Sequence, residues 1–145
     1  MSFVIFSTPL LNSFADLKFF RDYTKISVKY PMQIRELTLK ELDTAWELVK
    51  LLRTSLDYDT FEDLIYEMQD AKYTMIGIFE NSELVAYAGV KITTNLYDKR
   101  HLCVQEFIVK PSAIEEKYKN FLDEYLKDYA NIGACEKVVF SENCC

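Results

Sequence analysis

The segment from Leu102 to Lys119 contains two features that could support chemistry. One is a carboxylate on an apolar strand, and the other is the start of a helix. Alternation in the run 102–109 predicts that every second residue from Leu102 to Ile108 shares one strand face, so Glu106 lies among apolar neighbours. Partial burial of this kind gives a carboxylate the basicity that a general base needs. We therefore predict Glu106 as the catalytic residue, with an exposed or ion-paired edge carboxylate as the alternative.

A predicted helix begins directly after Pro111, where this strand ends. A helix N-terminus presents unpaired backbone N–H groups and the positive end of the helix dipole, which together bind phosphate groups. The segment 112–119 contains no glycine, the residue that lets a backbone close around a phosphate. Lys117 and Lys119 supply positive charge, but two glutamates in the first turn oppose it. The pattern predicts an anion-binding corner with an incomplete loop.

The rest of the chain predicts the elements that must position these residues. Thr38 and Glu41 form a capping box before one amphipathic helix, and Thr60 begins a second. Gly133 suits a left-handed cap after a third helix, which extends from Ile114 to Tyr129. The predicted strands are 33–35, 75–79, 84–92, 102–109 and 137–141.

From Met32 these elements follow the order β-α-α-β-β-β-α-β. The second and third strands form a hairpin with a polar turn, and the last strand returns through a helix, which predicts a parallel pair with a right-handed crossover. The fold class is therefore α+β, an α/β sandwich in which helices flank a mixed, mostly antiparallel sheet. We expect one domain over 32–145, preceded by an N-terminal extension over 1–31 with a short strand, a helix and a strand.

Composition excludes several function classes. The net charge of -6, without a basic stripe, argues against a nucleic-acid partner. No apolar run approaches a membrane span, so we expect no membrane association and a cytoplasmic protein. Four cysteines and one histidine, His101, lack paired ligand spacing, so we expect free thiols, a solvent-exposed histidine and no metal site. Three glycines cannot form a P-loop or a dinucleotide fingerprint.

The element order, the hairpin 76–89 and the run Gln105–Pro111 resemble the GNAT superfamily of acyl-CoA-dependent N-acyltransferases. The resemblance covers about residues 32–141 and includes the Val-x-Pro that ends the strand at Val109. It implies that acetyl-CoA is the co-substrate. It also implies that the backbone of Phe107, Ile108 and Val109 pairs with the pantetheine arm, and that the following loop holds the pyrophosphate.

The chain departs from the family pattern in two places. The loop positions that the family fills with Arg, Gly and Gly fall at Ile114, Lys117 and Lys119, so we predict weak CoA binding, or none, through the usual loop. Family members also continue past the strand at 137–141 with a helix and two strands, whereas this C-terminus is shortened. We hypothesise that the extension 1–31 replaces those elements and completes the sheet.

Two function classes follow from the resemblance. The first is an N-acetyltransferase that acts on a small-molecule or peptide amine, with Asp57 and Asp59 near the acceptor favouring a cation unless they form a solvated acidic loop. The second is a non-catalytic GNAT-like interaction module that has lost the CoA loop. Its exposed sheet edge could recruit a strand or form a homodimer. A shortened form of a longer enzyme would explain both departures.

Overall fold

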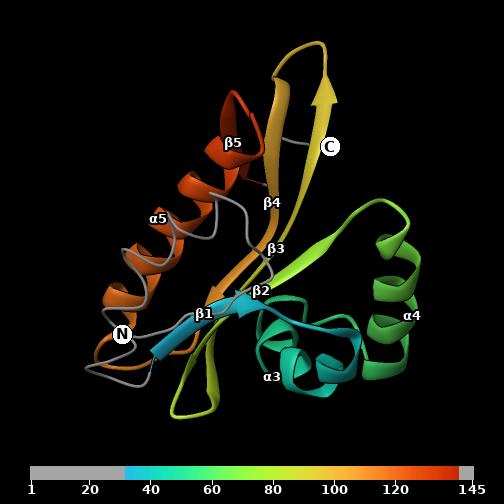
Figure 1. Cartoon of the computed structure of the whole chain (residues 1–145). Coiled ribbons are helices and arrows are strands. Elements are labelled where there is room, and N and C mark those ends of the chain that lie inside the picture. Colours follow the sequence, from blue (N-terminus) through green and yellow to red (C-terminus); the bar gives the residue numbers. More distant parts are fainter. Residues whose placement is uncertain (1–31, 141–145) are drawn as a thin grey trace.

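The computed structural model describes residues 32–140, and the predictions for 1–31 and 141–145 lie outside this part of the chain. Its elements follow the predicted order, and the α+β class with a mixed sheet is confirmed (Figure 1). The strands are β1 Met32–Glu36, β2 Thr74–Glu80, β3 Glu83–Asn95, β4 Lys99–Val109 and β5 Lys137–Phe140. The α-helices are α3 Leu42–Leu52, α4 Tyr58–Gln69 and α5 Glu115–Ile132.

The sheet has the strand order β1-β2-β3-β4-β5. The first four strands pair antiparallel, and β5 pairs parallel with β4 after the crossover through α5, as predicted. Asn81 and Ser82 form the β2–β3 turn with φ angles of 54° and 69°. Positive φ at both turn residues is the conformation that matches the twist of a two-residue hairpin.

Helices cover both faces of the sheet (Figure 1). The first core lies between the sheet and α5, and includes the fully buried Leu122 and Leu126. The second lies between the sheet and the pair α3 and α4, and includes Phe61, Ile65 and Tyr87. Both cores follow from apolar residues at helical spacing on one side of each helix.

A β-bulge in β4 reverses the faces of the strand at its centre. Gly89 pairs with Glu106 and the next residue, Val90, pairs with Val104, so Gln105 is an extra residue without a counterpart on β3. Val104 therefore belongs to the core under α5, whereas the Glu106 carboxylate bonds to a tyrosine of the opposite core. The prediction that every second residue from 102 to 108 shares one face is wrong, because the extra residue shifts the alternation.

Helix α5 ends in a Schellman-type turn. The Cys135 N–H donates to the Ala130 carbonyl oxygen at 2.9 Å and the Ala134 N–H to Asn131 at 3.1 Å. The left-handed residue is Ala134, with φ 59°, whereas Gly133 has φ -80°. Our assignment of Gly133 to the left-handed position is wrong by one residue. A Cβ at Gly133 would lie 2.6 Å from Ile92 Cδ1, so this glycine allows the close approach of β3.

Ala134→Gly is expected to stabilise the protein, because glycine adopts positive φ without the steric cost that a Cβ brings. We expect the free energy of unfolding to rise by about 0.5–1 kcal/mol, measured by urea denaturation. Ala130→Gly, in the interior of the same helix, is the control and should lower it. An equal loss of stability in both variants would contradict the assignment of Ala134 to the left-handed position.

Two sequence expectations about reactive side chains need correction. His101 is fully buried rather than exposed, and its Nδ1 lies 2.9 Å from the Lys99 carbonyl oxygen. Among the described cysteines, Cys135 is a free thiol, but Cys103 is disulfide-bonded, so the expectation of free thiols is wrong for Cys103.

Candidate active site around Glu106

Glu106 follows the bulge in β4, and its carboxylate is held at both oxygens. Oε1 accepts a hydrogen bond from the Tyr73 hydroxyl at 2.5 Å. Oε2 lies 3.2 Å from Nη2 of Arg53, and the Glu106 side chain is 14% exposed. The carboxylate is thus fixed in orientation and still accessible from solvent, which are two requirements of a general base.

Two buried tyrosines form a hydrogen-bonded chain that ends at Glu106. The hydroxyl oxygens of Tyr73 and Tyr87 are 2.9 Å apart. Because Tyr73 gives its single hydroxyl proton to Glu106, Tyr87 must be the donor to Tyr73. Burial, followed by the neighbouring Tyr87 and Glu106, raises the pKa of Tyr73 well above its usual value, and burial raises the pKa of Tyr87. Both hydroxyls therefore stay protonated and keep the carboxylate in place.

Gly89 makes room for this arrangement. It lies opposite Glu106 in the β3–β4 ladder. A Cβ at this position would overlap the Tyr73 hydroxyl oxygen and Oε1 of Glu106. Gly89 thus lies at the register shift of the β3–β4 ladder, and the groups that approach it are the hydroxyl of a core tyrosine and the Glu106 carboxylate.

Arg53 is the residue that directly follows α3. Its Nη2 donates to the carbonyl oxygen of Gln105 at 2.7 Å as well as to Glu106. One guanidinium nitrogen thus binds the bulge and the carboxylate together. Neither Arg53 nor Tyr73 was predicted, because they lie 53 and 33 residues from Glu106 in sequence and no local pattern links them to it.

The predicted cofactor-binding residues Phe107, Ile108 and Val109 lie where β4 extends past its pairing with β5. Within the described residues, that pairing runs from His101 to Val104 (Figure 1). Residues 107–109 pair only with β3 on their other side. Their outer edge is therefore open to an extended chain in the part of the molecule that the structure describes.

The start of α5 uses its backbone N–H groups within its own turn. The Ile114 N–H donates to Ser112 Oγ at 3.3 Å, and the Lys117 N–H donates to the Ile114 carbonyl oxygen at 3.0 Å. Glu115 Oε1 accepts from the Ser112 N–H at 3.3 Å, in the turn that precedes the helix. These contacts occupy donors that an open phosphate loop would present, and they place a carboxylate at the same point.

Lys117 and Lys119 are exposed on the first turns of α5. Tyr118 between them is buried, and its hydroxyl donates to the carboxylate of Glu80 on β2. Burial and this hydrogen bond raise the pKa of Tyr118 to about 12, so the hydroxyl remains a donor. Both lysines thus lie on the first turns of a helix that the Tyr118–Glu80 hydrogen bond links to the sheet.

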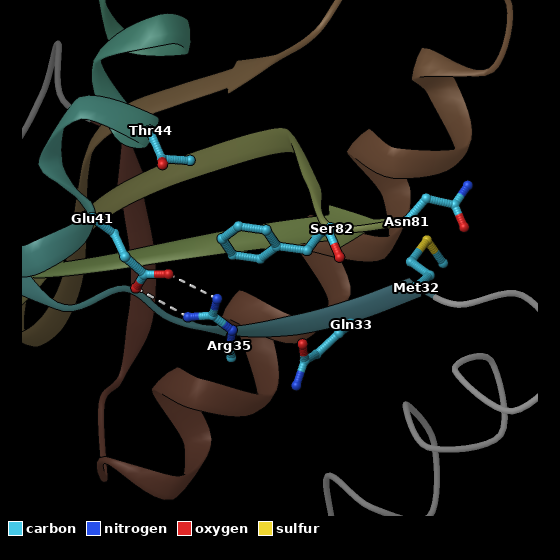
Figure 2. Close-up of a pocket in the computed structure, with 8 residues that line it drawn as sticks. Met32, Gln33, Arg35, Glu41, Thr44, Asn81 and Ser82 are labelled. Carbon is cyan, nitrogen blue, oxygen red and sulfur yellow. Dashed lines mark hydrogen bonds and ion pairs between the residues drawn. The ribbon is translucent and has the colours of Figure 1, made fainter.

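Two cavities lie beside the β2–β3 turn, and neither is lined by Glu106. One, of about 530 Å³, contains the Arg35–Glu41 ion pair and the turn residues Asn81 and Ser82 (Figure 2). The other, of about 630 Å³, lies between α3 and the same turn. The Glu41 carboxylate in the first is a weak base, because hydrogen bonds from Arg35 lower its pKa to about 2. The Glu83–Lys110 pair that lines the second is exposed, so both cavities are weaker candidates for chemistry than the Glu106 site.

The Arg35–Glu41 pair should make stability depend on pH. Hydrogen bonds from Arg35, with those from Thr38 in the predicted capping box, lower the pKa of Glu41 from 4.5 to about 2. A lowered folded-state pKa contributes stability that is complete above pH 4.5 and is lost as pH falls toward 2.

We therefore expect Glu41→Gln to lower the free energy of unfolding by about 1 kcal/mol at neutral pH and by less near pH 3. Urea denaturation of both proteins at the two pH values measures this. A difference that stays constant with pH would contradict the role of the ionised carboxylate.

The described residues, 32–140, contain no group of three or more His, Cys, Asp or Glu side chains placed to hold a metal ion. None of their helices combines the length and apolar character needed to cross a membrane.

No family model and no curated protein matches the sequence. Solved structures do match. A GNAT family acetyltransferase from Staphylococcus aureus is 9% identical with a TM-score of 0.65, over 76% of this chain and 85% of that chain. Aminoglycoside N-acetyltransferase AAC(6')-Iy, in complex with CoA, is 15% identical with a TM-score of 0.67, over 76% of each chain. Glucosamine-6-phosphate N-acetyltransferase from Arabidopsis thaliana is 18% identical with a TM-score of 0.62, over 79% and 82%. The chain therefore has the GNAT fold.

Proposed function

We propose that this protein is an N-acyltransferase that moves an acyl group from acetyl-CoA to an amine, with Glu106 as the general base. The observation that carries the proposal is the Glu106 carboxylate, held by Tyr73 and Arg53 at the bulge of β4. The fold that the chain shares with solved acetyltransferases supports it.

In the proposed reaction, Tyr73 donates to Oε1 of Glu106 at 2.5 Å, and Oε2, which has the longer 3.2 Å contact with Arg53, takes a proton. The amine nitrogen attacks the thioester carbonyl carbon and loses a proton to Oε2 directly or through a water molecule. The carbon–sulfur bond breaks, the thiolate leaves and takes a proton from solvent, and Glu106 returns its proton to solvent. Positioning of the two reactants supplies most of the acceleration, because it removes the entropy cost of their encounter.

For the acyl donor, we propose that the open backbone edge of Phe107, Ile108 and Val109 binds the pantetheine arm. Lys117 and Lys119 would supply charge to the pyrophosphate in place of loop amides. The amides at the start of α5 fit this role poorly, because Ser112 and the Ile114 carbonyl already accept from them. Donor binding should therefore depend on the β4 edge more than on the α5 terminus.

Isothermal titration of the full chain with acetyl-CoA and with CoA tests donor binding. Dissociation constants in the micromolar range would support the enzyme. Absence of heat at millimolar concentrations, with a protein shown to be folded by circular dichroism, would overturn the acetyl-CoA part of the proposal.

A further prediction concerns the contribution of Lys117 and Lys119 to acetyl-CoA binding. A Lys117→Ala and Lys119→Ala double variant should weaken acetyl-CoA binding about 3- to 10-fold, because exposed charge pairs contribute about 0.5–1 kcal/mol each. The loss should shrink at high salt, where such charges are screened. Lys127→Ala, farther along α5, is the matched control. Unchanged affinity in the double variant would remove both lysines from the site.

A non-catalytic interaction module is the second candidate, and the bonded amides and two first-turn glutamates of α5 favour it. In this function β5, the last strand of the described sheet, would add a strand from a partner or from a second copy. Failure of donor binding together with a dimer in sedimentation analysis would favour the module over the enzyme.

A further inference from the structure

The most exposed charged group at the Glu106 site is the guanidinium of Arg53. The Arg53 side chain is 40% exposed, against 14% for Glu106. Its contacts with the Gln105 carbonyl oxygen and with Glu106 both use Nη2. A guanidinium has five N–H donors, so the three on Nε and Nη1 have no partner among residues 32–140. The site therefore offers a partly exposed anion-binding group beside its base.

This arrangement disfavours a simple cationic amine as acceptor. An ammonium group that approaches Oε2 of Glu106 must pass close to Arg53. Two like charges 4 Å apart repel by about 1 kcal/mol in water and about 4 kcal/mol at an effective dielectric of 20. An acceptor that carries a negative charge next to its amine converts this repulsion into attraction.

The sequence suggested that Asp57 and Asp59 favour a cationic acceptor, but Asp57 has a structural contact of its own. The Asp57 carboxylate caps α4 and accepts from the Thr60 N–H at 2.8 Å. The same contact corrects the predicted start of this helix, which lies at Tyr58 rather than Thr60. Asp57 is thus part of a helix cap, and the charge beside Glu106 is the positive one of Arg53.

We propose that the acceptor is an amine with a carboxylate on the adjacent carbon, as in a free α-amino acid, and that Arg53 binds this carboxylate. The proposal rests on the acyl transfer proposed above. Arg53 Nη2 and Glu106 Oε2 are 3.2 Å apart, so the site presents a positive and a negative group side by side. An α-amino acid carries its ammonium and carboxylate groups on one carbon, and each can face the opposite charge. The Nε–H and Nη1–H groups of Arg53 can each donate a charge-assisted hydrogen bond to such a carboxylate.

Binding of the common L-amino acids and of the corresponding amino-acid amides to the full chain tests this, by isothermal titration. We expect at least one amino acid to bind about 10-fold or more tightly than its amide. Arg53→Gln should abolish that difference. Arg53→Lys, which keeps the charge but replaces the planar guanidinium and its separate donors with one ammonium group, should retain only part of it. Thermal unfolding of each variant identifies any that fails to fold. The comparison of amino acids with their amides in the wild-type protein tests the proposal even if a variant does not fold.

Equal binding of amino acids and amides by the wild type would overturn the proposal, as would absence of amino-acid binding at millimolar concentrations. Acetyl transfer to the same compounds separates this proposal from the function on which it rests. Amides acetylated as fast as amino acids would overturn the role of Arg53 and leave the acyltransferase in place. A carboxylate preference in binding without any transfer would support the Arg53 subsite and contradict the acyltransferase.

Discussion

Glu106→Gln is expected to lower the turnover number about 100-fold or more, the usual effect of removing a general base. Glutamine keeps the size of the side chain and can still accept from Tyr73, but it cannot take a proton from the amine. The affinity for acetyl-CoA should stay nearly unchanged, because the proposed donor site uses the backbone of Phe107, Ile108 and Val109. Steady-state rates and isothermal titration measure the two quantities separately.

The control for this variant is Glu83→Gln, which removes a carboxylate that is 56% exposed and paired with Lys110 at the β2–β3 hairpin. It should leave turnover within about twofold of the wild type, because an exposed ion pair contributes at most about 1 kcal/mol to stability and none to the site. A Glu106→Gln protein that is folded and as active as the wild type would remove Glu106 from the mechanism.

The second large effect is expected from Gly89→Ala. The added methyl group overlaps the Tyr73 hydroxyl oxygen and Oε1 of Glu106. Gly89 is paired with Met75 of β2 and Glu106 of β4, which restrains its backbone from moving away. Overpacking of this kind costs about 1–3 kcal/mol in the free energy of unfolding. Turnover should also fall, by up to about 100-fold, because a displacement of the base by about 1 Å is enough for such a loss.

A double-mutant cycle makes this prediction specific. Tyr73→Phe removes the oxygen that the new methyl group meets first, so Gly89→Ala should cost less stability in the Tyr73→Phe background than in the wild type. Gly77→Ala is the control, because its added methyl group meets the flexible ends of Leu84 and Leu37 and lies away from Glu106. Additive effects of Gly89→Ala and Tyr73→Phe on the free energy of unfolding would contradict the steric account of Gly89.

The sequence was sufficient to predict the order of the elements, because local patterns carry that information. The capping box of Thr38 and Glu41 is present, and the crossover through α5 gives the parallel pair that was expected. Helix ends were less accurate, since Asp57 rather than Thr60 caps α4. Several polar residues in this segment could cap the helix equally well, so the local sequence does not single out Asp57.

The candidate site was only partly predictable. Glu106 was found from alternation, although the bulge at Gln105 places it on the opposite face from the one that alternation predicts. Arg53 and Tyr73 reach it from the end of α3 and the start of β2, through contacts that depend on how α3 packs against the sheet and how β3 joins β2 to β4. Such long-range contacts produce no characteristic spacing of residues in the sequence. Gly89 was the one local sign of them, because a strand glycine indicates that another group comes close.

Several N–H groups at the start of α5 are already hydrogen-bonded, so the GNAT fold alone does not establish acyl transfer. Ser112 Oγ and Glu115 Oε1 accept from the N–H groups of Ile114 and Ser112 in the turn that leads into the helix, and these are N–H groups that a phosphate could bind. The chain thus has the GNAT fold and a carboxylate held by Tyr73 and Arg53, together with a helix start whose N–H groups are partly hydrogen-bonded within the turn.

The most direct test of the central claim is the detection of acetylated product by mass spectrometry, after the full chain is incubated with acetyl-CoA and a panel of amines that includes α-amino acids. We expect the wild type to release CoA and an equal amount of N-acetylated amine, and Glu106→Gln to form little of either. A folded wild-type protein that forms no acetylated amine above the rate without enzyme would contradict the claim.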